Sequence, residues 1–342
     1  MQLQLPTIAV VGATGLVGRT MLQVLDEHEF PIGKLRLLAS ARSAGSSMEF
    51  RGERYEVEEL TENSFDGIDI ALFSAGGAAS KKYAPFAAAA GCVVIDNSSA
   101  WRMHPQVPLV VPEVNAHDLR SHHGIIANPN CSTIQLVVAL KPIEDAYGLK
   151  RVVVSTYQSV SGAGQKGVDH LTAEIEGREP DARISSHRVA FNTVFHAFID
   201  DSGVTEEEQK VRRETRRIMN LPDLPIAVTC VRVPILGGHG ESVNIETVRP
   251  FTIDELRHTL EHAKGVILQD EPREEYYPTP YKSEDRDEVF VGRIRRDDTV
   301  ENGAYLWVVA DNLRKGAATN AVQIARALLE MDCVTYSKLT LW

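Results

Sequence analysis

A short apolar run, TIAVVG at residues 7–12, leads into a turn with glycines at positions 12, 15 and 18. The run predicts a buried strand, and LVGRTMLQVLDEH at 16–28 predicts an amphipathic helix that opens at this turn. Gly12 permits the tight bend, Gly15 lets the backbone approach a pyrophosphate, and Gly18 allows close helix–strand packing. The helix N-terminus then offers free N–H groups to a phosphate. This arrangement favours a dinucleotide site over a plain turn.

The first third of the chain alternates strand and helix patterns. Further strands are predicted at 35–40, 68–75 and 92–99, with an Ala-rich helix at 81–90 between the last two. Strands that alternate with helices in this way predict an α/β fold with a Rossmann-like, doubly wound parallel sheet. We expect its ligand at the carboxyl ends of the strands.

The end of the second strand indicates which dinucleotide binds. An NAD site usually carries Asp or Glu there, about 20 residues after the glycines, to bind the ribose 2′-OH. This strand ends instead in Ser40, Ala41, Arg42 and Ser43. Two hydroxyls and a guanidinium suit a 2′-phosphate, so NADP is the predicted cofactor. The alternative is a solvated loop with a surface arginine.

The pattern changes after about residue 130, where predicted strands become more numerous. The predicted strands are 151–160, 227–235, 242–248, 288–297 and 304–311, and the predicted helices are 205–219, 252–263 and 318–331. The Pro- and charge-rich stretch 269–288 is expected to be a surface loop. With 342 residues the chain can form two domains of ~100–200 residues each, so we expect a second, mixed α+β domain.

The formal net charge of −11 argues against binding to nucleic acid or to an anionic membrane, because either would require a basic face. No apolar run approaches the ~18–20 residues of a membrane span, and the N-terminus lacks the pattern of a signal peptide. The four cysteines form no C-x-x-C pair, so we expect neither a disulfide framework nor a metal site. These features predict a cytoplasmic protein without a bound metal.

Cys131 lies in NPNCSTIQLVVAL, where Pro129 and Asn130 predict a turn and the apolar pattern after Ser132 predicts a helix. A thiol at a helix N-terminus is activated, because the dipole and the free N–H groups favour the thiolate. The alternative is a structural cysteine buried in the core.

A thiolate nucleophile needs a partner that accepts and donates protons. The sequence has 11 histidines, and His239 is the best candidate because it lies in the Gly-rich stretch PILGGHGES. We expect a turn between two strands there, which could present the imidazole to a cleft. Surface exposure or burial in the core is the alternative for any single histidine.

Several motifs in one order resemble the aspartate-β-semialdehyde dehydrogenase family, in its bacterial form, over nearly the full length. They are VGATGLVG (11–18), LLASARSAG (37–45), FSAGG (73–77), NPNCST (128–133), TYQSVSGAG (156–164), RVPILGGHGES (232–242), YPTP (277–280), VFVGRIRRD (289–297) and RKGAATNAVQIA (314–325). The resemblance implies an NADP-binding domain at 1–130, to which the C-terminal helix segment 317–342 returns, and a catalytic and dimerisation domain at 131–316. The implied assembly is a homodimer, and a tetramer remains open.

The resemblance also implies a reaction, the NADPH-dependent reduction of L-aspartyl-4-phosphate to L-aspartate 4-semialdehyde with release of phosphate. The reaction would pass through a thioester on Cys131 and would lead towards lysine, threonine, methionine and isoleucine.

Position by position, the resemblance assigns roles to motif residues. Cys131 would be the nucleophile, His239 the acid/base, and Gln158 would orient the acyl intermediate. The implied substrate-binding residues are Arg102 and Lys210 for the phosphate, Glu207 for the ammonium, Arg232 for the α-carboxylate, and Asn130. The implied cofactor-binding residues are Gly12, Thr14, Gly15, Leu16, Val17, Gly18, Ser40, Arg42, Ser43, Ser74, Ala75, Gly76, Ser161, Gly162 and Asn320. The family most often has Ser after the catalytic His, where this chain has Gly240, but that residue takes no part in the chemistry.

Three alternatives are weighed against this interpretation. N-acetyl-γ-glutamyl-phosphate reductase performs the same chemistry, but its motif has Gly before the cysteine and an aromatic residue after it, where this chain has Asn130 and Ser132. Glyceraldehyde-3-phosphate dehydrogenase shares the thioester chemistry, but its S-C-T-T-N sequence is absent. A non-catalytic NADP-binding redox sensor that uses Cys131 is the alternative from another class, and substrate turnover would exclude it.

Overall fold

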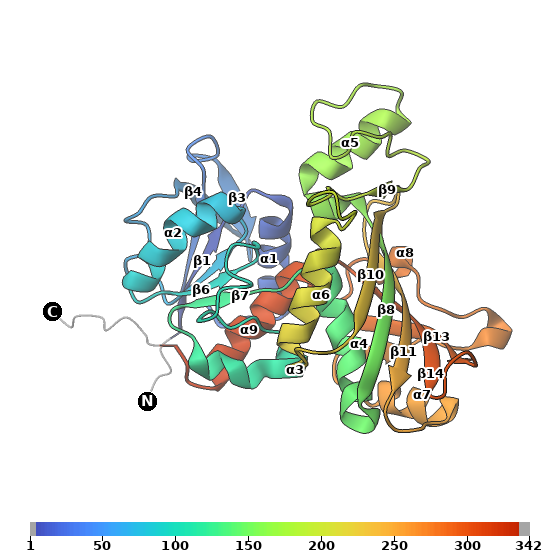
Figure 1. Ribbon diagram of the computed structural model, residues 1–342. Helices are drawn as coiled ribbons and strands as arrows, with labels where there is room; N and C mark the ends of the chain where they lie inside the picture. Colours follow the sequence, from blue (N-terminus) through green and yellow to red (C-terminus); the bar gives the residue numbers. More distant parts are fainter. Residues whose placement is uncertain (1–4, 335–342) are drawn as a thin grey trace. The chain divides into compact units, whose positions relative to one another are not determined.

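The computed structural model describes residues 5–334, and the chain divides into two compact units (Figure 1). The first unit contains the residues up to Pro129 and those from Ala317 onward, and the second runs from Asn130 to Gly316. Residues 1–4 and 335–342, which belong to the predicted first domain, lie outside the described residues. None of the described helices is both long enough and apolar enough to cross a membrane.

The first unit is built on a seven-stranded sheet in the order β3-β4-β2-β1-β5-β6-β7. Its strands are β1 (Thr7–Val11), β2 (Lys34–Ala39), β3 (Ser47–Phe50), β4 (Glu53–Glu59), β5 (Ile70–Phe73), β6 (Val93–Asp96) and β7 (Ile125–Ala127). Neighbouring strands are parallel except in the β3–β4 hairpin at one edge. The central strands β1 and β5 are almost entirely buried and apolar, as expected for parallel strands that are covered on both faces.

The strand order reverses at β1. The chain passes from β1 to β2 on one side and later returns to β5 on the other side. In open α/β sheets, ligands bind beyond the carboxyl ends of the strands at such a reversal. The glycine turn that follows β1 and the SAGG segment that follows β5 are therefore at the expected position for a dinucleotide.

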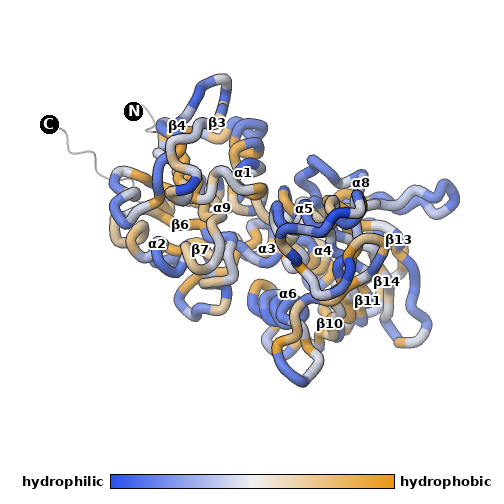
Figure 2. Tube along the Cα trace, turned by 90° about the horizontal axis from the view of Figure 1, so that it is seen from above, coloured by the Kyte–Doolittle hydropathy of each residue, from blue (hydrophilic) through white to orange (hydrophobic). Residues whose placement is uncertain are grey.

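The helices of the first unit are α1 (Leu16–Glu27), α2 (Gly77–Ala89), the short α3 (Pro112–Asn115) and α9 (Thr319–Glu330). Although α9 comes from the far end of the sequence, it contacts α1, β5 and β6. Leu25 of α1 and Leu328 of α9 share one buried core with the strands. Figure 2 shows that hydrophobic residues lie along the inner strands and α9, whereas hydrophilic residues lie along the outer loops.

The second unit contains another seven-stranded sheet, in the order β12-β13-β14-β11-β8-β10-β9. Its strands are β8 (Leu149–Gln158), β9 (Val194–Phe195), β10 (Ile226–Arg232), β11 (His239–Thr247), β12 (Val266–Leu268), β13 (Val289–Asp297) and β14 (Gly303–Ala310). The β8–β10 and β12–β13 pairs are parallel and the others are antiparallel. This mixed sheet, together with the doubly wound first sheet, confirms the predicted fold class.

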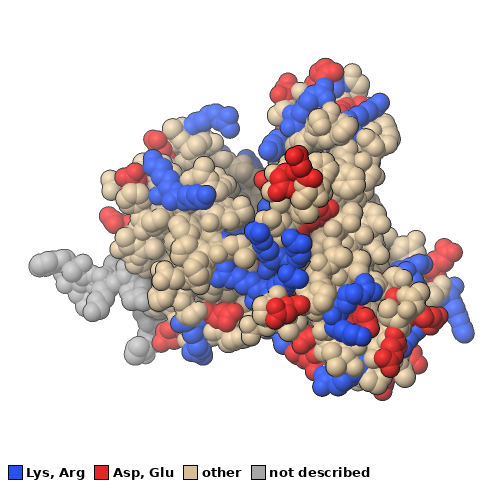
Figure 3. Space-filling view, in the orientation of Figure 1, with Lys and Arg blue, Asp and Glu red and all other residues tan. Residues whose placement is uncertain are grey.

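The helices of the second unit are α4 (Cys131–Tyr147), α5 (Gln165–Ile175), α6 (Glu206–Ile218), α7 (Ile253–Glu261) and the short α8 (Pro280–Ser283). The central helix α4 contacts β8, β11, β13 and β14, and α6 contacts β10. Thr205 and Glu208 form a capping box at the start of α6, whose first turn is acidic and whose last turn is basic. Figure 3 shows acidic side chains over the start of α6 and basic side chains further along it.

Candidate active site

The site is centred on a cysteine and a histidine, each at the start of an element. Cys131 is the first residue of α4, His239 is the first residue of β11, and Cys131 Sγ lies 3.2 Å from His239 Nε2. The prediction that His239 lies in a turn was wrong, because β11 begins at this residue rather than at Ser242. Pairing with β8 places His239 directly opposite Gln158, so the two side chains lie on the same face of the sheet.

Cys131 differs from the other cysteines in its surroundings. All four are free thiols, and burial raises the pKa of Cys92 and Cys230 above the ordinary value. Cys131 and Cys333 are partly exposed, and Cys131 has the imidazole of His239 as a neighbour. Cys131 therefore combines exposure with a proton partner, the two properties that a nucleophilic thiol needs.

Asn130 fixes the start of α4. Its Oδ1 accepts hydrogen bonds from the N–H groups of Ser132 and Thr133, at 3.0 Å and 3.2 Å, as an N-cap residue does. Its own N–H donates to Glu214 Oε2 and its Nδ2 donates to Glu207 Oε1, both at 2.7 Å. The residue before the nucleophile is thus anchored to α6 by both its backbone and its side chain.

His239 is fully buried, and this burial is the main reason that its pKa falls from 6.5 to about 3. The imidazole is therefore neutral near pH 7. Its Nδ1 lies 3.1 Å from the Ser159 backbone N–H and 3.1 Å from the Gly238 carbonyl oxygen. The first contact suits the tautomer with the proton on Nε2, and the second suits a proton on Nδ1. The contact with the Gly238 carbonyl is the one that leaves Nε2 free of a proton and able to accept one from Cys131.

Asn312, which was not predicted from the sequence to be a site residue, holds the two residues that contact the His239 ring. The buried Asn312 Oδ1 accepts hydrogen bonds from Gly238 N–H at 2.9 Å and from Ser159 Oγ at 3.0 Å. Its Nδ2 donates to Ser161 Oγ at 3.0 Å. The available signal was its position, two residues before the RKGAATN motif and two residues after the end of the last strand.

Gln158, Glu207 and Lys210 form a polar cluster beside Asn130. Gln158 Nε2 donates to Ser132 Oγ at 2.7 Å and lies 3.3 Å from Glu207 Oε1. Lys210 Nζ lies 3.4 Å from Glu207 Oε2, since the two residues are three positions apart on α6 and share one face. The cluster brings an amide, a carboxylate and an ammonium to one place within the second unit.

Arg232 ends β10 beside the same site. Its Nη1 donates to the Ser159 carbonyl at 2.7 Å, and its Nη2 lies 3.0 Å from His196 Nε2. Burial lowers the pKa of Arg232 from its ordinary value. A Cβ added at Gly162 would lie 3.4 Å from both Arg232 Nη1 and His239 Nε2, so Gly162 lies against both groups.

Packing explains why a glycine is present at position 240, where the family most often has Ser. Alternation along β11 places it on the face of the sheet opposite to His239. A Cβ at Gly240 would lie 2.5 Å from the ring of Trp307 on β14. The glycine thus makes room for an aromatic side chain and leaves the His239 face unchanged.

The glycine turn of the first unit has the geometry of a phosphate cradle. Gly12 has a φ of +83°, and a Cβ there would lie 2.6 Å from the Ser74 carbonyl oxygen. A Cβ at Gly18 would lie 2.2 Å from the Gly12 carbonyl oxygen. Gly15 is the N-cap of α1 and supplies no capping side chain. The first-turn N–H groups, which include those of Leu16 and Val17, are therefore suited to a phosphate ligand.

Other residues that the sequence assigns to the cofactor lie in the segments that flank this turn. Thr14 Oγ1 lies 3.4 Å from Ser43 Oγ, while Ser40 and Arg42 are exposed after β2. On the other side, Ala75 is exposed and Gly76 is the N-cap of α2, with a φ of +83° and no capping side chain. Uncapped helix ends of this kind suit the phosphates of a dinucleotide.

Two further predicted residues have structural contacts within the first unit. Arg102 is buried, and its Nε and Nη2 donate to the carbonyls of Asn128 and Asn97 at 2.9 Å and 2.7 Å. Asn320 is also buried, and its Nδ2 donates to the Val110 carbonyl and to Asn128 Oδ1 at 3.0 Å and 2.6 Å. Their assignments to substrate phosphate and cofactor remain predictions.

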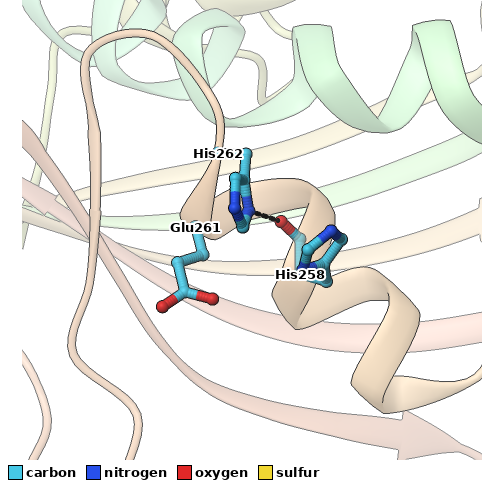
Figure 4. A group of neighbouring side chains, drawn as sticks. All are labelled: His258, Glu261 and His262. Carbon is cyan, nitrogen blue, oxygen red and sulfur yellow. Dashed lines mark hydrogen bonds between the residues drawn. The ribbon is translucent and has the colours of Figure 1, made fainter.

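A separate group of possible metal ligands lies on the surface of α7. His258, Glu261 and His262 are exposed, and their ligand atoms lie within 4.8 Å of one another (Figure 4). His262 Nδ1 is 2.8 Å from the His258 carbonyl oxygen, which it caps at the end of the helix, and the two rings are 4.1 Å apart. Helix capping and ring contact account for this arrangement. The expectation that the chain holds no metal remains a prediction.

Comparisons with known proteins assign the family. The family model described as "Semialdehyde dehydrogenase, NAD binding domain" matches residues 7–122. The model described as "Semialdehyde dehydrogenase, dimerisation domain" matches residues 140–315. The two models thus correspond to the two compact units, and the first supports the binding of NAD or NADP.

Individual relatives agree with the family models. Aspartate-semialdehyde dehydrogenase of Aquifex aeolicus is 56% identical over 94% of this chain and 98% of the relative. The Bacillus subtilis enzyme of the same name is 49% identical over 96% and 98%. The crystal structure of aspartate semialdehyde dehydrogenase II from Vibrio cholerae, complexed with ASA, matches with a TM-score of 0.92 and 46% identity, covering 96% of this chain and 99% of that one. The resemblance drawn from the motifs is confirmed, and the chain belongs to the aspartate-semialdehyde dehydrogenase family.

Proposed function

We propose that this chain catalyses the NADPH-dependent reductive dephosphorylation of L-aspartyl-4-phosphate to L-aspartate 4-semialdehyde through a thioester on Cys131. The observation that carries the proposal is the 3.2 Å contact between Cys131 Sγ and His239 Nε2, in which the buried imidazole is neutral. This is the arrangement of a thiol nucleophile with its base. The product serves the synthesis of lysine, threonine, methionine and isoleucine.

In the first half of the reaction, His239 Nε2 accepts the thiol proton as Cys131 Sγ attacks the acyl carbon. The bond from that carbon to the phosphate oxygen breaks, inorganic phosphate leaves, and a thioester remains on the protein. Gln158 Nε2, which lies beside the start of α4 through its bond to Ser132, supplies an amide donor that can orient the acyl group. His239 keeps this proton as an imidazolium and can donate it in the second half of the reaction.

In the second half, the thioester carbon accepts hydride and becomes a thiohemiacetal. Reduced NADP, when bound, supplies that hydride, and a thioester accepts it more readily than a carboxylate or an oxyester. His239 protonates the developing alkoxide and then removes that proton again as the C–S bond breaks. The aldehyde leaves, and the imidazolium returns its proton to the Cys131 thiolate, so that the thiol and the neutral imidazole are restored. The phosphate takes its proton from water, and atoms and charges then balance over the cycle.

The charged groups around this pair match the charges of an aspartyl substrate. Arg232 is suited to the α-carboxylate, because a guanidinium binds carboxylates with two parallel hydrogen bonds. Glu207 is suited to the α-ammonium and Lys210 to the phosphate, since they lie on one face of α6 beside Asn130. Arg102 is assigned to the phosphate by family resemblance alone.

NADP is proposed as the cofactor rather than NAD. The glycine turn provides uncapped N–H groups at the start of α1, and the segment after β2 carries Ser40, Arg42 and Ser43 but no acid. This donor set fits a 2′-phosphate and lacks the carboxylate that an NAD ribose would use.

We also propose that the chain acts in the cytoplasm as a homodimer. A reducing compartment would keep its four free thiols, including that of the nucleophile, in the reduced form. The match of residues 140–315 to a dimerisation domain supports self-association. Light scattering at several protein concentrations distinguishes a dimer from a tetramer.

The proposal is tested in the reverse direction. Formation of NADPH from NADP⁺ should require both aspartate semialdehyde and inorganic phosphate, and NAD⁺ should be a poor substitute. Activity on N-acetylglutamate semialdehyde alone would transfer the chain to the acetylated substrate. No turnover of either aldehyde by folded protein that binds NADPH would contradict the proposal.

A further inference from the structure

His196 lies next to Arg232 and has no part in the mechanism described above. It follows β9, the two-residue strand that pairs with the end of β10, and Arg232 lies opposite Val194 in that pair. The side chain is half-buried, and its Nε2 lies 3.0 Å from Arg232 Nη2. The family motifs in the sequence did not include this residue.

The contact defines which form of His196 is present. A guanidinium can only donate hydrogen bonds, so His196 Nε2 must accept and the ring proton must be on Nδ1. Burial lowers the pKa of His196, the Arg232 and Lys210 cations also lower it, and Glu207 and the Cys230 backbone act in the opposite direction. The imidazole is therefore available as a neutral acceptor near neutral pH and above.

Arg232 is consequently held at both terminal nitrogens. Nη1 donates to the Ser159 carbonyl at 2.7 Å and Nη2 donates to His196. The plane of the guanidinium is fixed by these two acceptors. Its remaining N–H donors form no hydrogen bond within residues 5–334 and can bind a ligand. A planar fork that is already oriented loses less conformational freedom when a carboxylate binds.

We infer that His196 is a positioning residue that orients the Arg232 guanidinium toward the α-carboxylate of the substrate and thereby favours aldehydes that carry this carboxylate. The inference rests on the proposed function, because it takes Arg232 as the carboxylate ligand. It adds the residue that follows β9 to substrate selection, outside the nucleophile, the acid/base and the residues that touch the substrate.

The test compares His196→Leu with His196→Gln, since glutamine retains a neutral acceptor and leucine does not. Each protein is assayed with aspartate semialdehyde and with 3-aminopropanal, the same aldehyde without the carboxylate. His187→Leu, at an exposed histidine of the preceding loop, is the matched control. Thermal unfolding of every variant establishes that it is folded.

With aspartate semialdehyde, His196→Leu should raise KM by about tenfold with little change in kcat, the scale of one lost hydrogen bond to a charged group. Activity on 3-aminopropanal and the KM for phosphate and NADP⁺ should be unchanged. His196→Gln should restore most of the lost kcat/KM, and His187→Leu should behave as the native protein.

Three results would overturn the inference. An equal loss on both aldehydes would show a general structural role. A folded His196→Gln protein as impaired as His196→Leu would show that acceptor chemistry is irrelevant, and an unchanged KM in His196→Leu would show that Arg232 needs no such partner. If the native protein itself fails to turn over aspartate semialdehyde, the proposed function fails and not this residue alone.

Discussion

His239 and Gln158 are direct cross-strand partners on the antiparallel strands β11 and β8. Their side chains therefore project from the same face of the sheet, beside Cys131 at the start of α4. The next pair on that face is Glu241 opposite Thr156, and both of these residues are fully buried. The β8–β11 pair thus carries the imidazole of His239, the amide of Gln158 and the buried carboxyl group of Glu241 on one face.

The low pKa of His239 predicts a specific loss of stability in acid. In the unfolded chain this imidazole accepts a proton near pH 6.5, whereas the folded protein resists protonation down to about pH 3. The unfolded state binds more protons in that interval, so the free energy of unfolding falls as the pH falls through it. His239→Asn should lack this component, and unfolding in urea at several pH values measures the difference. His258→Asn, at an exposed histidine, is the control, and identical pH curves for His239→Asn and native protein would contradict the account.

The raised pKa of Glu241 predicts that the free energy of unfolding falls as the pH rises, the opposite of the trend caused by His239. Its burial holds the pKa of the carboxyl well above the ordinary 4.5, and neither of its oxygens has a hydrogen-bond partner that meets standard geometry among the described residues. Stability is therefore fully present below pH 4.5 and declines as the pH rises toward the folded pKa, since only the unfolded carboxyl ionises there. Glu241→Gln should be more stable than the native protein near pH ~8 and similar to it near pH ~4. Urea unfolding at both pH values is the measurement, with Glu301→Gln as an exposed control. A native carboxyl that is already ionised in the folded state would give no such gain.

Arg42 tests the choice of cofactor. Removing its guanidinium in Arg42→Ala should raise the KM for NADPH by roughly tenfold and leave the KM for NADH nearly unchanged, because only NADPH has the 2′-phosphate. Steady-state kinetics with both cofactors measures this. Arg54→Ala, at an exposed position on β4, should alter neither value. An equal rise for both cofactors would place Arg42 elsewhere in the site.

Lys210 tests the assignment of the phosphate. In the reverse reaction, Lys210→Ala should raise the KM for inorganic phosphate by about tenfold, since it removes the cation that pairs with the anion. The KM for NADP⁺ should be unchanged, and Lys264→Ala, at an exposed lysine after α7, should match the native protein. A change confined to NADP⁺ would mean that Lys210 serves a different anion.

Much of the first unit followed from local sequence patterns. The apolar strands and the glycine turn are specified by neighbouring residues, so their order was predictable. The β3–β4 hairpin was not predicted, because β3 has only four residues and β4 is rich in charge. Its only local signal was Arg51-Gly52, where both residues have positive φ, as a tight hairpin turn requires.

The site depended more on tertiary contacts. The position of Cys131 at a helix start could be predicted from its flanking residues. His239 was predicted to lie in a turn because the neighbouring glycines are typical of turns, although β11 begins at His239. Asn312 and His196 act through hydrogen bonds to residues far away in the sequence, at distances that no local pattern encodes. These hydrogen bonds form only in the folded second unit, where the distant segments lie side by side.

The central claim is that Cys131 carries the acyl group. Intact-protein mass spectrometry after mixing with L-aspartyl-4-phosphate, in the absence of NADPH, should show one added aspartyl group, and peptide mapping should place it on Cys131. Cys131→Ser should remain folded, retain NADPH binding and show no such adduct. Turnover by Cys131→Ser at a near-native rate, or an acyl group on a different residue of the native protein, would contradict the account.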